Sequence, residues 1–197
     1  MRTLLPALAA TLLMASPAAA QSDPKAPVDA LSDGLIAIMK GGAKLGQAGR
    51  AAQIGPVVDR SFDLALMARL AVGAAWTEAA PADRAALIAA FRRLTINEYA
   101  HNFSSYSGEA FRIDPNVDAR GTDRLVKTML TAPREDPVAI AYRLRESGGQ
   151  WRIIDVFFKN AISQLATRRA DFEKIVQSGG VKALVVHVNG LADKAAR

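Results

Sequence analysis

The hydrophobic pattern of the chain changes its period twice. From Val28 to Tyr106, apolar residues recur at steps of three and four, the spacing that places them on one face of a helix. From Phe111 to Phe158 the period changes toward two, which is typical of strands. From Ile162 to Leu191 the helical spacing returns. This order predicts an α+β fold in which several helices cover a curved antiparallel sheet of about four strands.

Glycine pairs divide the helical parts into shorter elements. Gly41-Gly42 is predicted to end the first helix, and Gly179-Gly180 is predicted to end the helix after the sheet. Between them, residues 47–58 fit a short helix that Gly55-Pro56 is expected to interrupt.

The longest predicted helix covers residues 81–105. Pro81 suits its first position, because proline lacks the amide hydrogen that has no partner there. The apolar stripe of this helix is rich in aromatic residues, among them Phe91, Tyr99 and Phe103. Such a stripe fits ordinary packing against a sheet, and it also fits the wall of an apolar cavity.

The strands are predicted at residues 111–113, 125–130, 138–145 and 151–158. A loop is expected at Asp114-Pro115-Asn116, and Ser147-Gly148 is interpreted as a two-residue hairpin turn.

That turn sets which side chains share a face of the sheet. It places Leu144 opposite Trp151, Tyr142 opposite Ile153, and Ile140 opposite Asp155, all on one face. Arg143 and Arg152 then lie opposite each other on the second face, together with Ile154, Val156 and Phe158. Two like charges directly opposite each other are unfavourable unless water solvates them, so this face is predicted to be open to water near the turn.

The first twenty residues have the pattern of a secretory signal peptide. Arg2 precedes the apolar run Leu4–Met14, and Ala18-Ala19-Ala20 precedes Gln21. The run is too short for a stable membrane span, although an uncleaved anchor is the alternative. Cleavage is favoured, so residues 1–20 are predicted to be removed and residues 21–197 to form a single exported domain. We expect it in the periplasm.

Charge narrows the choice of partners. Without Arg2, the 25 basic residues become 24 against 19 acidic ones, a net charge of about +5 by simple count. An exported protein meets little nucleic acid, so an anionic membrane surface or an acidic protein is the expected target. The chain has no cysteine, so its stability must come from its core rather than from disulfides.

Motifs for catalysis or metal binding are missing from the sequence. Its two histidines, His101 and His187, have no metal-like companion, and the common nucleophile, phosphate-binding and zinc motifs do not occur. No catalytic residue, metal or cofactor is therefore predicted. Asp155, inside an apolar run, could act as a general base, but a carboxylate held by backbone amides or an arginine is the favoured interpretation.

An ordered set of residues resembles a known family, the MlaC-type periplasmic phospholipid-binding proteins, also called the toluene-tolerance family. The resemblance covers about Val57 to Leu184. It rests on Phe62-Asp63, Ala68-Arg69, Gly73, Trp76, Phe91, Tyr99, Ile140-Ala141-Tyr142, Trp151-Arg152-Ile153-Ile154-Asp155-Val156, Ile162-Ser163, Arg168-Arg169 and Phe172. Residues 162–169 resemble more closely the HpnM branch, which is associated with hopanoid biosynthesis. Asn160-Ala161 departs from the family, in which a glycine is usual before the Ile-Ser pair.

The resemblance implies a sheet-and-helix fold around a deep apolar cavity that takes lipid acyl chains. It implies a monomeric shuttle for phospholipid or a hopanoid-type lipid between an outer-membrane lipoprotein complex and an inner-membrane ABC-type transporter. The residues predicted to line the cavity are Phe62, Leu66, Phe91, Leu94, Tyr99, Phe103, Met129, Tyr142, Leu144, Trp151 and Ile153. For each of them, ordinary core packing is the alternative. Two other functions stay open: a small isomerase or hydratase that uses Asp155 and Tyr142, and a transporter adaptor without cargo.

Overall fold

The computed structural model describes residues 23–197. The predicted signal peptide, residues 1–20, lies outside the described residues. Over residues 23–197, five helical segments and one five-stranded antiparallel sheet follow the predicted α+β order, and the fold class is confirmed. In the same range, no helix has both the length and the apolar character that crossing a bilayer requires.

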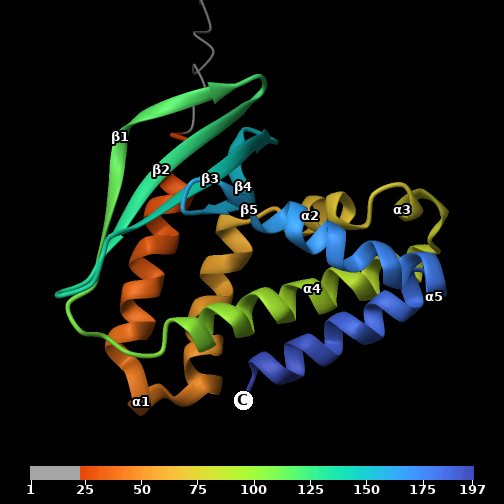
Figure 1. Cartoon of the computed structure of the whole chain (residues 1–197), viewed down its shortest axis with the longest axis horizontal. Coiled ribbons are helices and arrows are strands. Elements are labelled where there is room, and N and C mark those ends of the chain that lie inside the picture. The colour runs from red at the N-terminus through yellow and green to blue at the C-terminus, as the bar shows by residue number, and fades with distance from the viewer. Residues whose placement is uncertain (1–22) are drawn as a thin grey trace, which may run out of the picture.

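The first helical segment, α1 (Ala26–Ser61), is a helical hairpin. Its direction reverses at Gly42 (φ 47°, ψ −131°) and Gly46 (φ 61°, ψ 178°), conformations that only glycine adopts readily. The predicted break at Gly41-Gly42 is therefore confirmed. The second arm continues through Pro56, so the interruption predicted at Gly55-Pro56 is wrong. The two arms lie side by side at the sheet end of the molecule (Figure 1).

Two short helices and one long helix follow. The first, α2 (Leu64–Val72), begins after Asp63, whose carboxylate accepts a hydrogen bond of 2.9 Å from the Leu66 amide. Next come α3 (Ala75–Glu78) and α4 (Pro81–Asn102), which is slightly shorter than the predicted 81–105. α4 packs against both α1 and α5 (Gln164–Ala195).

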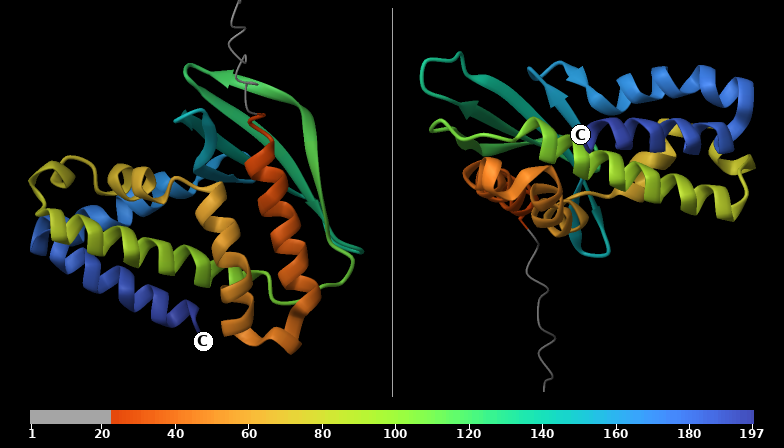
Figure 2. Two further views of the ribbon diagram at one scale, coloured as in Figure 1. Left: turned by 180° about the vertical axis from the view of Figure 1, so that it is seen from behind. Right: turned by 90° about the horizontal axis from the view of Figure 1, so that it is seen from below.

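The last segment, α5, is a second helical hairpin, which reverses at Gly180 (φ 66°, ψ −168°). Its two arms, together with α2, α3 and part of α4, extend away from the sheet (Figure 2). Gln47 of α1 donates a hydrogen bond of 2.8 Å to the carbonyl of Ala195, which joins the end of α5 to the α1 hairpin.

In residues 23–197 the strands form one sheet in the order β1-β2-β3-β4-β5. Their bounds are β1 (Ala110–Arg120), β2 (Asp123–Thr131), β3 (Val138–Ser147), β4 (Gln150–Phe158) and β5 (Ile162–Ser163). The loop predicted at Asp114-Pro115-Asn116 is wrong, because β1 runs through it with an irregular register between Ile113 and Val117. A proline is tolerated here because β1 is an edge strand.

The turn of the β3–β4 hairpin is one residue later than predicted. Ser147 pairs with Gln150, so Gly148 and Gly149 form the turn, with φ of 61° and 77°. A turn with positive φ at both central residues matches the natural twist of a hairpin, and two glycines adopt it without strain. Leu144 consequently lies opposite Ile153 rather than Trp151.

A register shift then exchanges the faces of β4. Leu144 pairs with Ile153, but the residue before it, Arg143, pairs with Asp155. Ile154 is therefore the extra residue of a β-bulge. Tyr142 pairs with Val156, and Ile140 pairs with Phe158.

The predicted assignment of faces is therefore wrong beyond the bulge. Val156 and Phe158 share the face of Tyr142, whereas Asp155 lies opposite Arg143 on the other face. The arginine opposite Arg152 is Arg145, not Arg143. A single extra residue has this effect because side chains alternate between faces with a period of two.

Candidate functional site: an apolar cavity with a charged end

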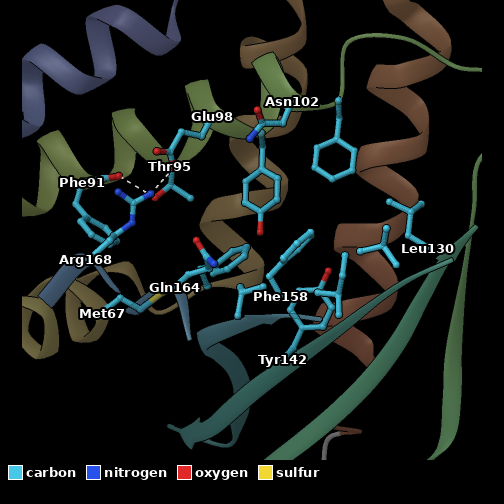
Figure 3. Close-up of a pocket in the computed structure, with 16 residues that line it drawn as sticks. Met67, Phe91, Thr95, Glu98, Asn102, Leu130, Tyr142, Phe158, Gln164 and Arg168 are labelled. Carbon is cyan, nitrogen blue, oxygen red and sulfur yellow. Dashed lines mark hydrogen bonds and ion pairs between the residues drawn. The ribbon is translucent and has the colours of Figure 1, made fainter. Parts of the chain in front are cut away.

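A cavity of about 470 Å³ lies between α4, the start of α5 and the sheet (Figure 3). This volume is within the range of small-molecule binding sites. The lining combines aliphatic and aromatic side chains with a few polar ones. It consists of Phe62, Met67, Phe91, Thr95, Glu98, Tyr99, Asn102, Phe103, Leu130, Val138, Ile140, Tyr142, Val156, Phe158, Gln164 and Arg168.

One face of α4 forms the helical wall. Phe91, Thr95, Glu98 and Asn102 follow one another at steps of four, three and four, so they share this face. Tyr99 lies 5.8 Å from the ring of Phe62 and 5.9 Å from the ring of Phe103, measured between ring centroids. These separations are typical of packed aromatic pairs. The aromatic stripe predicted from the sequence therefore faces the cavity.

The sheet forms the opposite wall through two cross-strand pairs, Tyr142–Val156 and Ile140–Phe158. Tyr142 is 2% exposed, whereas Phe158 is 41% exposed, so the cavity wall reaches solvent at the end of β4. The β4 bulge determines which side chains form this wall. Without it, Asp155 instead of Val156 would share the face of Tyr142.

The phenols of Tyr99 and Tyr142 are neutral groups in this wall. Burial raises the pKa of each well above its ordinary value, because an ionised phenolate would lose its solvation there. For Tyr99, the neighbouring Tyr142 and Glu98 raise the pKa further. Both side chains therefore contribute uncharged aromatic surface at neutral pH.

The start of α5 brings charge to the cavity. Gln164 and Arg168 are one helical turn apart and both line it. Arg168 donates a hydrogen bond to the Glu98 carboxylate, and its guanidinium lies 5.5 Å from the centroid of the Phe91 ring. Burial raises the pKa of Glu98, and the charge of Arg168 acts against that rise. Figure 3 shows this pair at the α4–α5 side, away from Leu130.

Eleven residues were expected in the lining, and the structure brings five of them together around the cavity. These are Phe62, Phe91, Tyr99, Phe103 and Tyr142. Leu94, Leu144 and Ile153 are buried in the core instead, and Trp151 is buried beneath Arg124. Leu66 packs against the core, and Met129 pairs with Ala139 and is 37% exposed. Contact of any of these side chains with a lipid stays a prediction.

Sequence reasoning missed the polar part of the lining. Glu98 lies at helical spacing from Phe91 and Asn102, so its position within the aromatic stripe was a usable signal. Arg168 belongs to the Arg168-Arg169 pair that supports the family resemblance, and nothing local in the sequence indicates that it meets Glu98, 70 residues away. Val156 and Phe158 were missed because of the bulge.

Asp155 has a full set of structural partners. It accepts hydrogen bonds from the amides of Val156 (2.8 Å) and Leu165 (3.0 Å) and from the Ser163 hydroxyl (2.6 Å). It thereby joins β4 to the start of α5 and is not among the cavity-lining residues. The structure does not bring it together with Tyr142, which lies on the opposite face of the sheet.

Neither histidine is among the residues that line this cavity. His101 is in the last turn of α4, and His187 lies edge-on to Phe172 at 6.4 Å. Within residues 23–197, no group of three or more His, Cys, Asp or Glu side chains is placed to hold a metal ion.

Comparison with known proteins identifies the family. The family model described as "MlaC protein" matches residues 29–189. The chain belongs to the MlaC family. Among solved structures, this MlaC-family fold is similar to the phospholipid-binding protein from Ralstonia solanacearum, which was solved in complex with a phospholipid. That likeness has a TM-score of 0.74 at 24% identity and covers 89% of this chain and 100% of the other.

Proposed function

We propose that the protein is a periplasmic lipid carrier whose cavity holds the acyl chains of a phospholipid. The observation that carries this proposal is the apolar cavity, which two walls of aromatic and aliphatic side chains form between α4 and the sheet. Membership of the MlaC family supports it, as does the similar fold of a protein solved with a phospholipid bound.

The energetics of lipid transfer explain why such a cavity would be useful. Each methylene removed from water is worth about 0.8 kcal/mol, so exposing an acyl chain of about 16 carbons costs on the order of ten kcal/mol. A carrier that encloses the chains removes most of this cost. Recognition then needs apolar volume and few polar groups, which fits the composition of the lining.

The wider pathway is part of the proposal. The N-terminal signal-peptide pattern supports export, and the family supports an exchange between an outer-membrane lipoprotein complex and an inner-membrane ABC-type transporter. The HpnM-like residues 162–169 add a hopanoid-type lipid as an alternative cargo. We expect the carrier to act as a monomer.

The test is to purify the protein without detergent, extract it with organic solvent and quantify lipid by mass spectrometry. About one lipid per protein is expected, with the identified species naming the cargo class. A preparation that carries no lipid, and takes none up from vesicles, would contradict the carrier function. That result would favour the adaptor, whereas turnover of a small substrate would favour the enzyme.

A further inference from the structure

Among the described residues, two charged side chains line the cavity, Glu98 of α4 and Arg168 of α5. They form an ion pair with each other, and their side chains are 36% and 21% exposed. The carboxamides of Asn102 and Gln164 line the same cavity. A negative charge, a positive charge and two carboxamides therefore line a cavity that is otherwise mostly apolar. Figure 3 shows Glu98 and Arg168 on the side away from Leu130.

This ion pair is partly withdrawn from water. Removing two charges from water is offset by their mutual attraction only when the remaining hydrogen-bonding capacity is also satisfied. The pKa of Glu98 is raised by burial, which indicates that its carboxylate is incompletely solvated.

α4 and α5 are also joined outside the cavity. Arg93 of α4 already bonds Asp193 and Asn189 of α5 on the exposed surface. The Glu98–Arg168 pair differs from this surface contact because it faces the cavity, where a ligand can reach both charges.

We propose that Glu98 and Arg168 form a headgroup site that selects zwitterionic phospholipids, with the phosphate on Arg168 and the ammonium on Glu98. The two protein charges cancel, so a headgroup that also carries both signs matches each of them without adding net charge. A headgroup with only a phosphate charge would gain the contact with Arg168 and meet repulsion from Glu98. This inference rests on the proposed lipid-carrier function and names its substrate class.

Competition between two headgroups tests the assignment. The lipid-free protein is incubated with vesicles that contain equal amounts of phosphatidylethanolamine and phosphatidylglycerol with identical acyl chains, and bound lipid is quantified after re-isolation. The wild type is expected to enrich phosphatidylethanolamine. Glu98→Gln removes the negative charge at nearly constant shape, and it should shift the bound ratio toward phosphatidylglycerol by about fivefold.

Two further variants complete the experiment. Arg168→Gln should lower the uptake of both lipids, because the phosphate of each lipid loses its positively charged partner. Glu98 remains and repels that phosphate. Arg92→Gln is the matched control: it breaks an exposed ion pair with Asp59, and Arg92 does not line the cavity. Its uptake and its bound ratio should equal those of the wild type.

The outcomes separate the two proposals. Wild-type uptake of both lipids in the vesicle ratio would overturn the headgroup site and leave the carrier function standing, as would enrichment that Glu98→Gln does not change. Failure to take up either lipid would overturn the headgroup site, and it would overturn the carrier function as well if the protein purified without detergent carries no lipid. If Glu98→Gln does not fold, as judged by circular dichroism, the wild-type ratio and the Arg168→Gln uptake decide alone.

Discussion

At the residue scale, two buried carboxylates show how the fold uses charge for structure. Asp155 holds the start of α5 against β4 through three hydrogen bonds. Asp123, at the start of β2, is 1% exposed and accepts hydrogen bonds from Arg143 (2.6 Å) and Arg145 (2.7 Å). Neither residue lines the cavity. A buried carboxylate in this protein is therefore better explained by its partners than by catalysis.

Replacing Asp123 should affect stability in a pH-dependent way. The hydrogen bond from Arg145 is the main cause that lowers the pKa of Asp123 below its ordinary 3.8. The ionised form therefore stabilises the fold above about pH 4, and this contribution disappears as pH falls through the lowered pKa. We expect Asp123→Asn to reduce the free energy of unfolding by about 1–3 kcal/mol at pH 7.

Urea denaturation at pH 7 and pH 3 checks this prediction. The difference between the wild type and Asp123→Asn should shrink at pH 3, because the unfolded wild type takes up a proton near its ordinary pKa of 3.8 and this offsets part of the advantage of the ionised native state. Asp118→Asn is the control on the same sheet, since its pair with Lys127 is exposed and should matter little. An equal difference at both pH values would contradict the role assigned to the Asp123 charge.

At the element scale, the two helical hairpins depend on glycines with positive φ. Gly180 in α5 has φ 66° and ψ −168°, a conformation that other residues adopt only with strain. A Cβ atom at this position would meet nothing within 4 Å. Any cost of Gly180→Ala therefore comes from the backbone and not from a clash.

We predict that Gly180→Ala lowers the free energy of unfolding by about 1–3 kcal/mol. Gly190 is the matched control in the same segment, because it is helical and a Cβ there also meets nothing within 4 Å. Gly190→Ala should stabilise the protein by about 0.5–1 kcal/mol. Thermal denaturation of the two variants should therefore shift in opposite directions. A melting temperature of Gly180→Ala that equals or exceeds that of the wild type would show that the Gly180 turn is not strained for alanine.

At the scale of the whole molecule, the cavity depends on separate parts of the chain meeting. α4, the start of α5, the segment around Phe62 and the sheet each supply part of the wall. The same helix also contributes to the solid core, because Leu94 is 1% exposed and does not line the cavity. α4 therefore supplies side chains to both the core and the cavity wall.

Filling the cavity should block uptake without unfolding the protein. Val138 lines the cavity, so Val138→Trp should place the indole in the cavity and lower bound lipid to about half or less. Val186→Trp is the matched control, because Val186 is 74% exposed on α5. Lipid per protein is measured by solvent extraction and mass spectrometry. Undiminished uptake by Val138→Trp would place the lipid elsewhere.

Core and cavity can be distinguished in the same series. Leu94→Trp inserts the same ring into packed core and should destabilise the protein by about 1–3 kcal/mol. Val138→Trp should lose much less, because its ring enters space that is free of protein atoms. Chemical denaturation of both variants measures the contrast.

The sequence by itself determined the order of helical and extended segments, since periodicity, the glycine pairs and the Pro81 start are local signals. It also determined the aromatic stripe of α4. Only the tertiary structure decided which strand faces reach the cavity, because the bulge at Ile154 moves side chains from one face of β4 to the other. Likewise, the meeting of Glu98 with Arg168 follows from the packing of α4 on α5. Such contacts join distant parts of the chain, and local periodicity carries no record of them.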